Sequence, residues 1–147
     1  MQMKLFIKRL DPRAALPAYQ TPGSAAMDLA AVLDEPVTVE PRALVSIPTG
    51  LAIALPGPEW VALVFARSGL GIKHGIALSN GVGVIDSDYR GEIRVGLTNL
   101  SDAPYTVMPG DRVAQLAVVP VVQAALERVE ALDDTGRGSG GFGSTGR

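Results

Sequence analysis

The segment EIRVGLT, residues 92–98, alternates apolar side chains with polar or small ones, and its large apolar members are Ile93, Val95 and Leu97. Successive side chains of a β-strand point to opposite faces, so this period of two predicts a strand with one buried face. Residues 51–55 (LAIAL) alternate between large and small apolar side chains with the same period. Both segments are therefore expected to be strands.

Two further segments, residues 60–65 (WVALVF) and 113–119 (VAQLAVV), are apolar on both faces. A strand of this composition suits a position where the domain core covers one face and another layer covers the other. A partner subunit is the simplest cover for the second face.

Residues that end strands interrupt the chain often. Its 147 residues (15.3 kDa) include 17 glycines and 11 prolines, whereas average usage would give roughly 17 or 18 of the two together. Short strands with such residues between them, about one break every ten positions, predict an all-β sandwich or jelly roll. The length fits a single domain.

The composition argues against several classes of protein. A formal net charge of −2 and an isoelectric point near 5.3 argue against stable nucleic-acid binding. The chain has no cysteine and one histidine, so disulfides are excluded and any metal should meet oxygen ligands. No apolar run approaches the ~20 residues of a membrane span, and residues 1–9 lack the features of a signal peptide. We therefore expect a cytoplasmic protein with no membrane partner.

Two segments do not fit the strand pattern. Residues 68–75 (SGLGIKHG) suit one short helix, with Ser68 near its N-terminal cap and Gly75 as its stop. Residues 123–132 place apolar side chains at helical spacing, which by periodicity alone favours a helix.

The glycine-rich residues 136–147 form the end of the chain. Such a segment cannot bury enough apolar surface to fold alone, so a mobile tail is one reading. The other is a segment that folds over an anion, with Arg137 and backbone N–H groups as donors and Phe142 as an aromatic lid.

Residues 80–92 (NGVGVIDSDYRGE) are the most informative for function. Asn80 and Gly81 between apolar runs predict a hairpin, and a second turn follows at residues 86–91. Asp86 could serve only as a turn former. Alternatively, the hairpin's backbone groups hold a flat polar ligand, Asp86 accepts a proton and Tyr89 stacks on the ligand.

Four polar side chains elsewhere also need an explanation. Arg67 and Ser68, between a strand and the short helix, form either a surface cap or an anion site. Asp28 and Gln115 each stand alone among apolar residues, so each needs a partner if it is buried.

Taken in order along the chain, these segments resemble the five motifs of the trimeric dUTPase family. The resemblance covers residues 25–146 and is carried by AMDL (26–29), RSG (67–69), GVIDSDYRG (83–91), PGDRVAQL (109–116) and RGSGGFGSTG (137–146). It implies hydrolysis of dUTP to dUMP and pyrophosphate with Mg²⁺, which limits uracil incorporation into DNA and supplies dUMP for dTMP synthesis.

The resemblance also implies a role for individual residues. Asp86 matches the catalytic aspartate that deprotonates the water attacking the α-phosphorus, and Gln115 the glutamine that holds this water. Asp28 matches the carboxylate that holds Mg²⁺ through water. The residues expected to bind substrate are Arg67, Ser68 and Gly69 at the phosphates, Asn80, Gly83, Val84, Ile85 and Tyr89 at uracil and deoxyribose, and Arg137, Phe142, Gly143 and Ser144 in the closing tail.

The architecture that the resemblance implies is an all-β, jelly-roll-like barrel or sandwich with one short helix, assembled as a homotrimer with sites shared between subunits. Residues 1–135 would form the jelly roll, and residues 136–147 a flexible lid of the same domain. For residues 123–132 the resemblance favours an extended arm that leads to the next subunit, so we expect mostly strand there.

Two other functions stay open at this point. A dCTP deaminase would share the fold, but it should carry a catalytic glutamate beside the phosphate arginine, where this chain has Gly-Leu-Gly at residues 69–71. A nucleotide-binding module without hydrolysis would need a damaged motif, yet Asp86, Gln115 and Arg137 are all present.

Overall fold

The computed structural model describes residues 3–143. Within that range the regular secondary structure is all β, as expected, except for one short helix, α1 (Ser68–His74). The strands are β1 (Phe6–Arg9), β2 (Met27–Ala30), β3 (Val37–Val39), β4 (Leu44–Pro48), β5 (Leu51–Ala54), β6 (Trp60–Phe65), β7 (Ile76–Leu78), β8 (Gly83–Ile85), β9 (Arg94–Asn99), β10 (Tyr105–Val107) and β11 (Arg112–Pro120).

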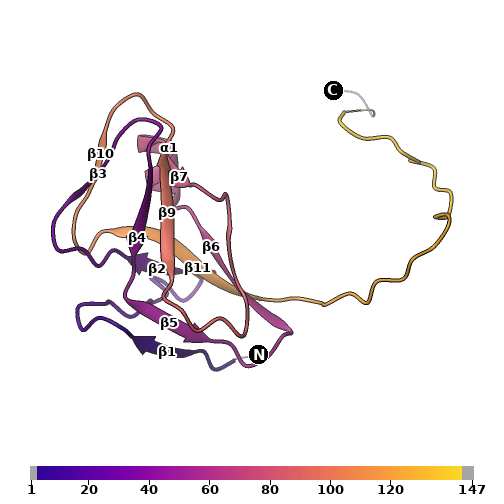
Figure 1. Cartoon of the computed structure of the whole chain (residues 1–147), viewed down its shortest axis with the longest axis horizontal. Coiled ribbons are helices and arrows are strands. Elements are labelled where there is room, and N and C mark those ends of the chain that lie inside the picture. Colours follow the sequence, from indigo (N-terminus) through magenta and orange to yellow (C-terminus); the bar gives the residue numbers. More distant parts are fainter. Residues whose placement is uncertain (1–2, 144–147) are drawn as a thin grey trace.

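The strands form two main antiparallel sheets, with the order β2-β11-β6-β8 in one and β4-β9-β7 in the other. Two-stranded pairs, β1 with β5 and β10 with β3, complete the sandwich. The layers are visible in Figure 1, where the chain beyond β11 runs away from them. The predicted jelly-roll sandwich is confirmed.

The strand predicted within residues 92–98 is β9, and its alternation of side chains matches its burial. Val95 and Leu97 are each 1% exposed and point into the core, whereas Arg94 is exposed. Strand β5 differs, because Leu51, Ala52 and Ile53 are all buried. Small alanines on its second face therefore mark close packing there and not a solvent-facing side.

The two strands predicted to be apolar on both faces, β6 and β11, lie side by side in the middle of the four-stranded sheet. Ala62 and Val64 of β6 are buried in the core, whereas Leu63 on the opposite face is only partly covered. Val84 of β8, which is paired with Leu63 of β6, is 63% exposed. The outer face of this sheet is thus an apolar surface that residues 3–143 of one chain leave accessible.

The predicted helix at residues 68–75 is confirmed as α1. Gly75 ends it with φ 68°, a left-handed conformation that favours glycine, and donates to the carbonyl of Gly71. Ser68 is the first helical residue, and the capping position is Arg67, with no side-chain hydrogen bond.

The hairpin predicted at Asn80 and Gly81 is wrong as a hydrogen-bonded pair of strands. The turn itself forms, with Gly81 at φ 73° and its N–H bonded to the carbonyl of Leu78. However, β7 before the turn pairs with β9, and β8 after it pairs with β6. The turn therefore joins the edges of two different sheets, because each strand finds a longer apolar neighbour elsewhere.

The expectation of strand at residues 123–132 is also wrong. The β11–β6 ladder ends where Pro120 is opposite Trp60, and the following residues form no regular secondary structure. Leu126 is 97% exposed and Leu132 is 85% exposed. The segment is an extended arm (Figure 1), and no strand within residues 3–143 pairs with it.

None of the helices formed by residues 3–143 has the length and apolar character needed to cross a membrane. A cytoplasmic location stays a prediction from the sequence.

Candidate active site

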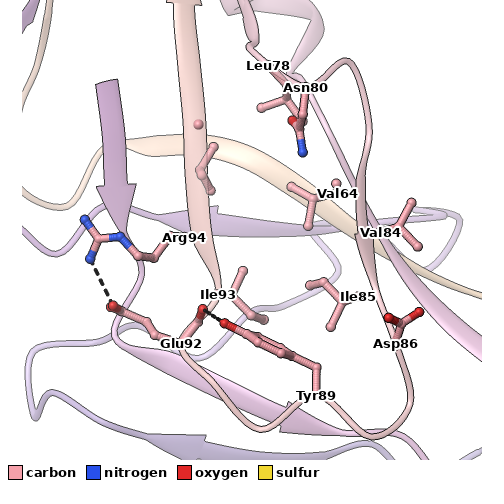
Figure 2. Close-up of a pocket in the computed structure, with 13 residues that line it drawn as sticks. Val64, Leu78, Asn80, Val84, Ile85, Asp86, Tyr89, Glu92, Ile93 and Arg94 are labelled. Carbon is pink, nitrogen blue, oxygen red and sulfur yellow. Dashed lines mark hydrogen bonds and ion pairs between the residues drawn. The ribbon is translucent and has the colours of Figure 1, made fainter. Parts of the chain in front are cut away.

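A cavity of about 270 Å³ opens beside β8 and β9. Figure 2 shows Asn80 at one end and Tyr89 at the other, with Val64, Ile85 and Ile93 between them. Six of the residues predicted to act on substrate line it together: Asn80, Gly83, Val84, Ile85, Asp86 and Tyr89. The structure thus assembles the predicted uracil and deoxyribose residues into one pocket.

The wall of this pocket is closely packed at Gly83, which favours glycine there. A Cβ there would lie 3.0 Å from the Cβ of Val64 on the neighbouring strand β6. Since β8 is an edge strand of its sheet, the backbone groups on its outer side do not bond to β6 and face away from the ladder. A polar ligand in the pocket can therefore pair with main-chain N–H and C=O groups of β8.

Asp86 follows β8 directly and begins the second predicted turn, in which the N–H of Tyr89 donates to its carbonyl (3.2 Å). Arg90 fixes this turn from outside by donating to the carbonyls of Ser87 (2.7 Å) and Tyr89 (3.0 Å). The Asp86 carboxylate is exposed, and none of the side-chain hydrogen bonds within residues 3–143 involves it. It is free to accept a hydrogen bond from a ligand or water.

A second group of predicted residues meets at the other end of the four-stranded sheet. The Asp28 carboxylate pairs with Nε of Arg67 at 3.2 Å through one oxygen. Its other oxygen accepts a hydrogen bond from Nη1 of Arg112 at 2.9 Å. Two guanidinium groups around one carboxylate leave a local excess of positive charge, which suits an anion.

Gln115 belongs to this second group. On β11 it is opposite both Asp28 of β2 and Phe65 of β6, and side chains directly opposite each other share a face of the sheet. Its amide donates to the carbonyl of Ala66 at 2.9 Å, which fixes the orientation of the side chain. The partner that a half-buried glutamine needs is therefore the main chain beside Arg67.

The two groups lie far apart within one chain. Ile85 is opposite Ala62, which places Asp86 near Val61, whereas Gln115 is opposite Phe65. Four residues along a strand span about 13 Å and two strand spacings about 10 Å, so the two backbones are about 16 Å apart. Side chains that share one water must bring their polar atoms within about 6 Å of each other. One chain alone does not place Asp86 and Gln115 around one water.

A third group lies on the chain segment beyond the arm. Nε of Arg137 donates to the carbonyl of Gly140 at 2.8 Å, and Phe142 has a fully exposed ring. Gly143 has φ 86°, and Ser144 lies outside the described residues. Figure 1 shows this segment well away from the sandwich, so it contacts neither of the other groups.

Two sets of residues were missed by the sequence argument. Glu92, Ile93, Arg94, Val95 and Gly96 also line the pocket, but their alternation was read only as a strand signal. Arg112 was quoted within a motif without a role, although a lone carboxylate at Asp28 called for a cationic partner. An alternating pattern predicts which side chains of a strand are buried. It does not predict which end of the strand lies at a cavity, so it gave no sign that these residues line the pocket.

A jelly-roll sandwich that combines a pocket beside β8 with two arginines around Asp28 has features that suit a nucleotide-binding β protein. The chain belongs to the dUTPase family, whose family model matches residues 12–146. It is 53% identical over 146 residues to the deoxyuridine 5′-triphosphate nucleotidohydrolase of Desulfitobacterium hafniense (strain DSM 10664 / DCB-2), covering 99% of this chain and 97% of that protein. The corresponding protein of Neisseria gonorrhoeae (strain NCCP11945) is 53% identical over 148 residues, covering 99% of each chain.

Solved structures agree with this assignment. The dUTPase of Staphylococcus bacteriophage 80alpha, in a structure with dUpNHpp, superposes with a TM-score of 0.89 at 26% identity. The match covers 99% of this chain and 100% of the phage chain. The fold expected from the motifs is therefore shared over essentially the whole length.

Proposed function

We propose that this protein hydrolyses dUTP to dUMP and pyrophosphate. The observation that carries the proposal is the pocket in which Asn80, Gly83 and Tyr89 converge with Asp86 at its rim, in a chain of the dUTPase family. Nucleotide analogue binding by the similar phage dUTPase supports a nucleotide as the ligand.

Base selection follows from the shape and backbone of the pocket. Uracil would pair with outward-facing main-chain groups of β8 and with Asn80, while Val84 and Ile85 border it. Cytosine would present a donor where uracil presents an acceptor, and an unmatched buried polar group costs about 1 to 3 kcal/mol. A 5-methyl group would need additional room in a cavity of about 270 Å³, which disfavours thymine.

Catalysis would begin when Asp86 accepts a proton from a water that attacks the α-phosphorus. Pyrophosphate would leave, and the hydroxyl of that water would stay on dUMP. A carboxylate is a weak base, so its contribution comes from position and from accepting the proton as attack proceeds. Gln115 would hold the same water.

Because Asp86 and Gln115 are about 16 Å apart in one chain, we propose that each site combines residues of different subunits. The accessible apolar face over β6 and β11 would then be covered by neighbouring copies, as in a homotrimer. The extended arm would carry the tail, residues 136–147, to a site formed by other chains.

The phosphates would lie against Arg67, Ser68 and Gly69. The N–H groups of Ser68 and Gly69 precede the first hydrogen bond of α1, which runs from Gly71 to the carbonyl of Arg67. Arg137 would reach the γ-phosphate, Phe142 would cover uracil, and Gly143 and Ser144 would close around the substrate. A lid of this kind excludes bulk water from the reaction.

Mg²⁺ is the metal we propose, with Asp28 holding it through water. Within residues 3–143, no three carboxylate, imidazole or thiol groups gather into a metal site. Mg²⁺ keeps several waters and prefers phosphate oxygens, so a single carboxylate such as Asp28 suits a cation that is carried mainly by the triphosphate. When bound, the ion would neutralise charge on the phosphates. Asp28 itself is fixed by Arg67 and Arg112, so its remaining lone pairs can accept from a metal-bound water.

Pyrophosphate release from dUTP with Mg²⁺, measured beside dCTP, dTTP and UTP, tests this function. The proposal predicts turnover of dUTP at least about 100-fold above the other three. Ammonia release from dCTP would instead indicate a deaminase. Tight dUTP binding with no turnover would indicate a binding module.

A further inference from the structure

Glu92 makes three polar contacts at the sugar end of the pocket. One carboxylate oxygen accepts from the N–H of Gly50 at 2.9 Å, and the other accepts from Nη1 of Arg94 at 3.0 Å. Its backbone carbonyl accepts from the hydroxyl of Tyr89 at 3.0 Å. Figure 2 shows Glu92 between Arg94 and Tyr89. The side chain is 26% exposed, so it is sheltered but reachable from the pocket.

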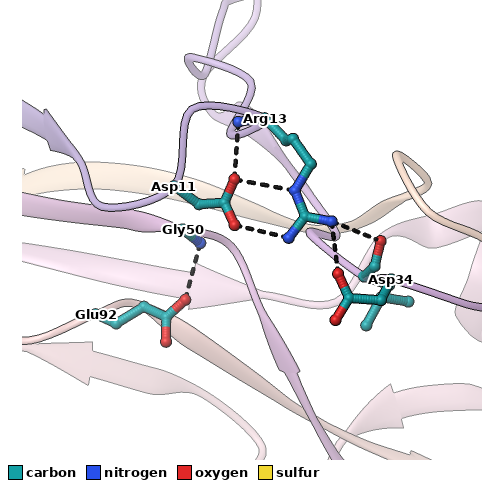
Figure 3. Close-up of polar contacts among 6 residues, drawn as sticks. Asp11, Arg13, Asp34, Gly50 and Glu92 are labelled. Atoms are coloured by element: carbon teal, nitrogen blue, oxygen red, sulfur yellow. Dashed lines mark hydrogen bonds and ion pairs between the residues drawn. The ribbon is translucent and has the colours of Figure 1, made fainter.

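The carboxylate of Glu92 is attached to rigid parts of the sandwich. Gly50 has φ 65°, and a Cβ there would lie 3.0 Å from the Cβ atoms of Ala14 and Asp11, so this turn is closely packed. Asp11 is fixed by Arg13, which also reaches Asp34 (Figure 3). The position of Glu92 is therefore set by the turn between β4 and β5, which contains Gly50, and by the loop at residues 11–14 that packs against this turn.

On its other side, Arg94 secures Glu92 to β4. The Arg94 guanidinium donates to the hydroxyl of Ser46 at 3.0 Å and to its carbonyl at 3.1 Å. Ile93, the residue between Glu92 and Arg94, donates to the carbonyl of Leu51 at 2.8 Å. Both the side chain and the following backbone of Glu92 are thus held by the sandwich.

Tyr89, in contrast, sits on an exposed turn. It is 46% exposed, and its hydroxyl bond to Glu92 is the contact that joins the end of the ring to the rigid framework. Its ring folds over Gly91, where any Cβ would collide with the tyrosine hydroxyl. The ring position therefore depends on where the Glu92 carbonyl lies.

We propose that Glu92 is a positioning residue that fixes Tyr89 and thereby sets the preference for deoxyribose over ribose. The inference rests on the proposed function, in which Tyr89 packs against the sugar. A ring that cannot retreat leaves no room for a 2′-hydroxyl, whereas a ring on a loosened turn can move aside. Glu92 acts on selectivity through Tyr89 and does not touch the reacting phosphorus.

The test is the ratio of kcat/KM for dUTP to kcat/KM for UTP in Glu92→Ala and Glu92→Gln. Both substrates are measured on one preparation, so the ratio does not depend on the fraction of folded enzyme. We expect Glu92→Ala to lower the ratio about tenfold, through a higher KM for dUTP and faster turnover of UTP, with kcat for dUTP within about twofold. Glu92→Gln keeps an acceptor for Gly50, so its ratio should stay within about threefold of the wild type.

A double-mutant cycle with Tyr89→Phe separates positioning from a general loss of stability. If Glu92 acts through the tyrosine hydroxyl, Glu92→Ala should change the ratio little once that hydroxyl is gone. Asp102→Ala is the control, because it removes a 97% exposed carboxylate whose partner is Arg42 on the surface.

An unchanged ratio in Glu92→Ala, or full additivity with Tyr89→Phe, would overturn this inference while leaving dUTP hydrolysis intact. A wild-type chain that does not hydrolyse dUTP would instead overturn the proposed function on which the inference rests.

Discussion

Asp28 lies between two guanidinium groups, those of Arg67 and Arg112. The ion pair of Asp28 with Arg67 spans 3.2 Å and that with Arg112 spans 2.9 Å, while the Asp28 side chain is only 14% exposed. A sheltered carboxylate holds both arginines in place at less cost than a fully buried one would. The triphosphate would therefore meet a preorganised cationic site and not two freely rotating side chains.

Asp86→Asn tests the base at the residue scale. The substitution keeps the shape of the turn and the neutral contacts of the pocket, but an amide does not accept a proton. We expect kcat for dUTP to fall by at least about 100-fold, with the Kd of a non-hydrolysable dUTP analogue changed less than about threefold. Steady-state kinetics and calorimetric titration measure the two quantities. Equal losses in kcat and in binding would count against the assignment of Asp86 as the base.

Asp11 gives a prediction on stability and pH. The side-chain hydrogen bond from Arg13 lowers the pKa of Asp11 from its usual 3.8 to about 2. Between those pH values the unfolded chain binds more protons than the folded one, so this contribution to stability is present above pH ~4 and is lost as pH falls through ~2. The difference in Tm between wild type and Asp11→Asn should therefore shrink from pH 5 to pH 2. A difference in Tm that stays constant over this pH range would show that the ion pair of Asp11 with Arg13 does not contribute to stability.

At the element scale, the period of two identified β9 because one face of that strand meets the core and the other does not. The same reasoning missed the partners of β7 and β8, because an Asn-Gly turn is local whereas pairing depends on which apolar strand is nearest in space. For residues 123–132 the helix that the spacing of apolar side chains favoured and the strand that the family resemblance favoured were both wrong, because a strand needs a hydrogen-bonding neighbour that residues 3–143 of one chain do not supply. Asp28, Arg67 and Gln115 could be found from their motifs, but the contact with Arg112 required the register of β2 and β11.

The tail is the element whose removal is most informative. Its residues make only local contacts in the described part, such as Arg137 with Gly140, so a chain ending at Thr135 should fold and assemble normally. We expect its kcat/KM for dUTP to fall at least about tenfold, because the lid residues and the γ-phosphate contact are lost. Analytical ultracentrifugation checks the assembly, and pyrophosphate release checks the activity. Undiminished hydrolysis by the shortened chain would remove the proposed role of the lid.

For the whole molecule, three groups of proposed site residues lie in three places on one chain. They are the pocket beside β8, the cluster around Asp28 (Asp28 on β2, Arg67 between β6 and α1, and Arg112 and Gln115 on β11), and the tail beyond the arm. The apolar outer face of the four-stranded sheet lies between the first two groups, so in the proposed trimer it would be the contact between copies. Assembly would thus cover apolar surface and complete the site in one step. Each subunit would contribute a different group to each site.

The most direct test of this account mixes two inactive chains. The two variants, Asp86→Asn and Gln115→Ala, are co-expressed in equal amounts so that mixed trimers form. Some sites of these trimers then take the native Asp86 from a Gln115→Ala subunit and the native Gln115 from an Asp86→Asn subunit. Random assembly gives both native residues to about one site in four, so we predict about a quarter of wild-type dUTP hydrolysis, far above either variant alone. Mixed trimers with no more activity than the separate variants would contradict the shared site.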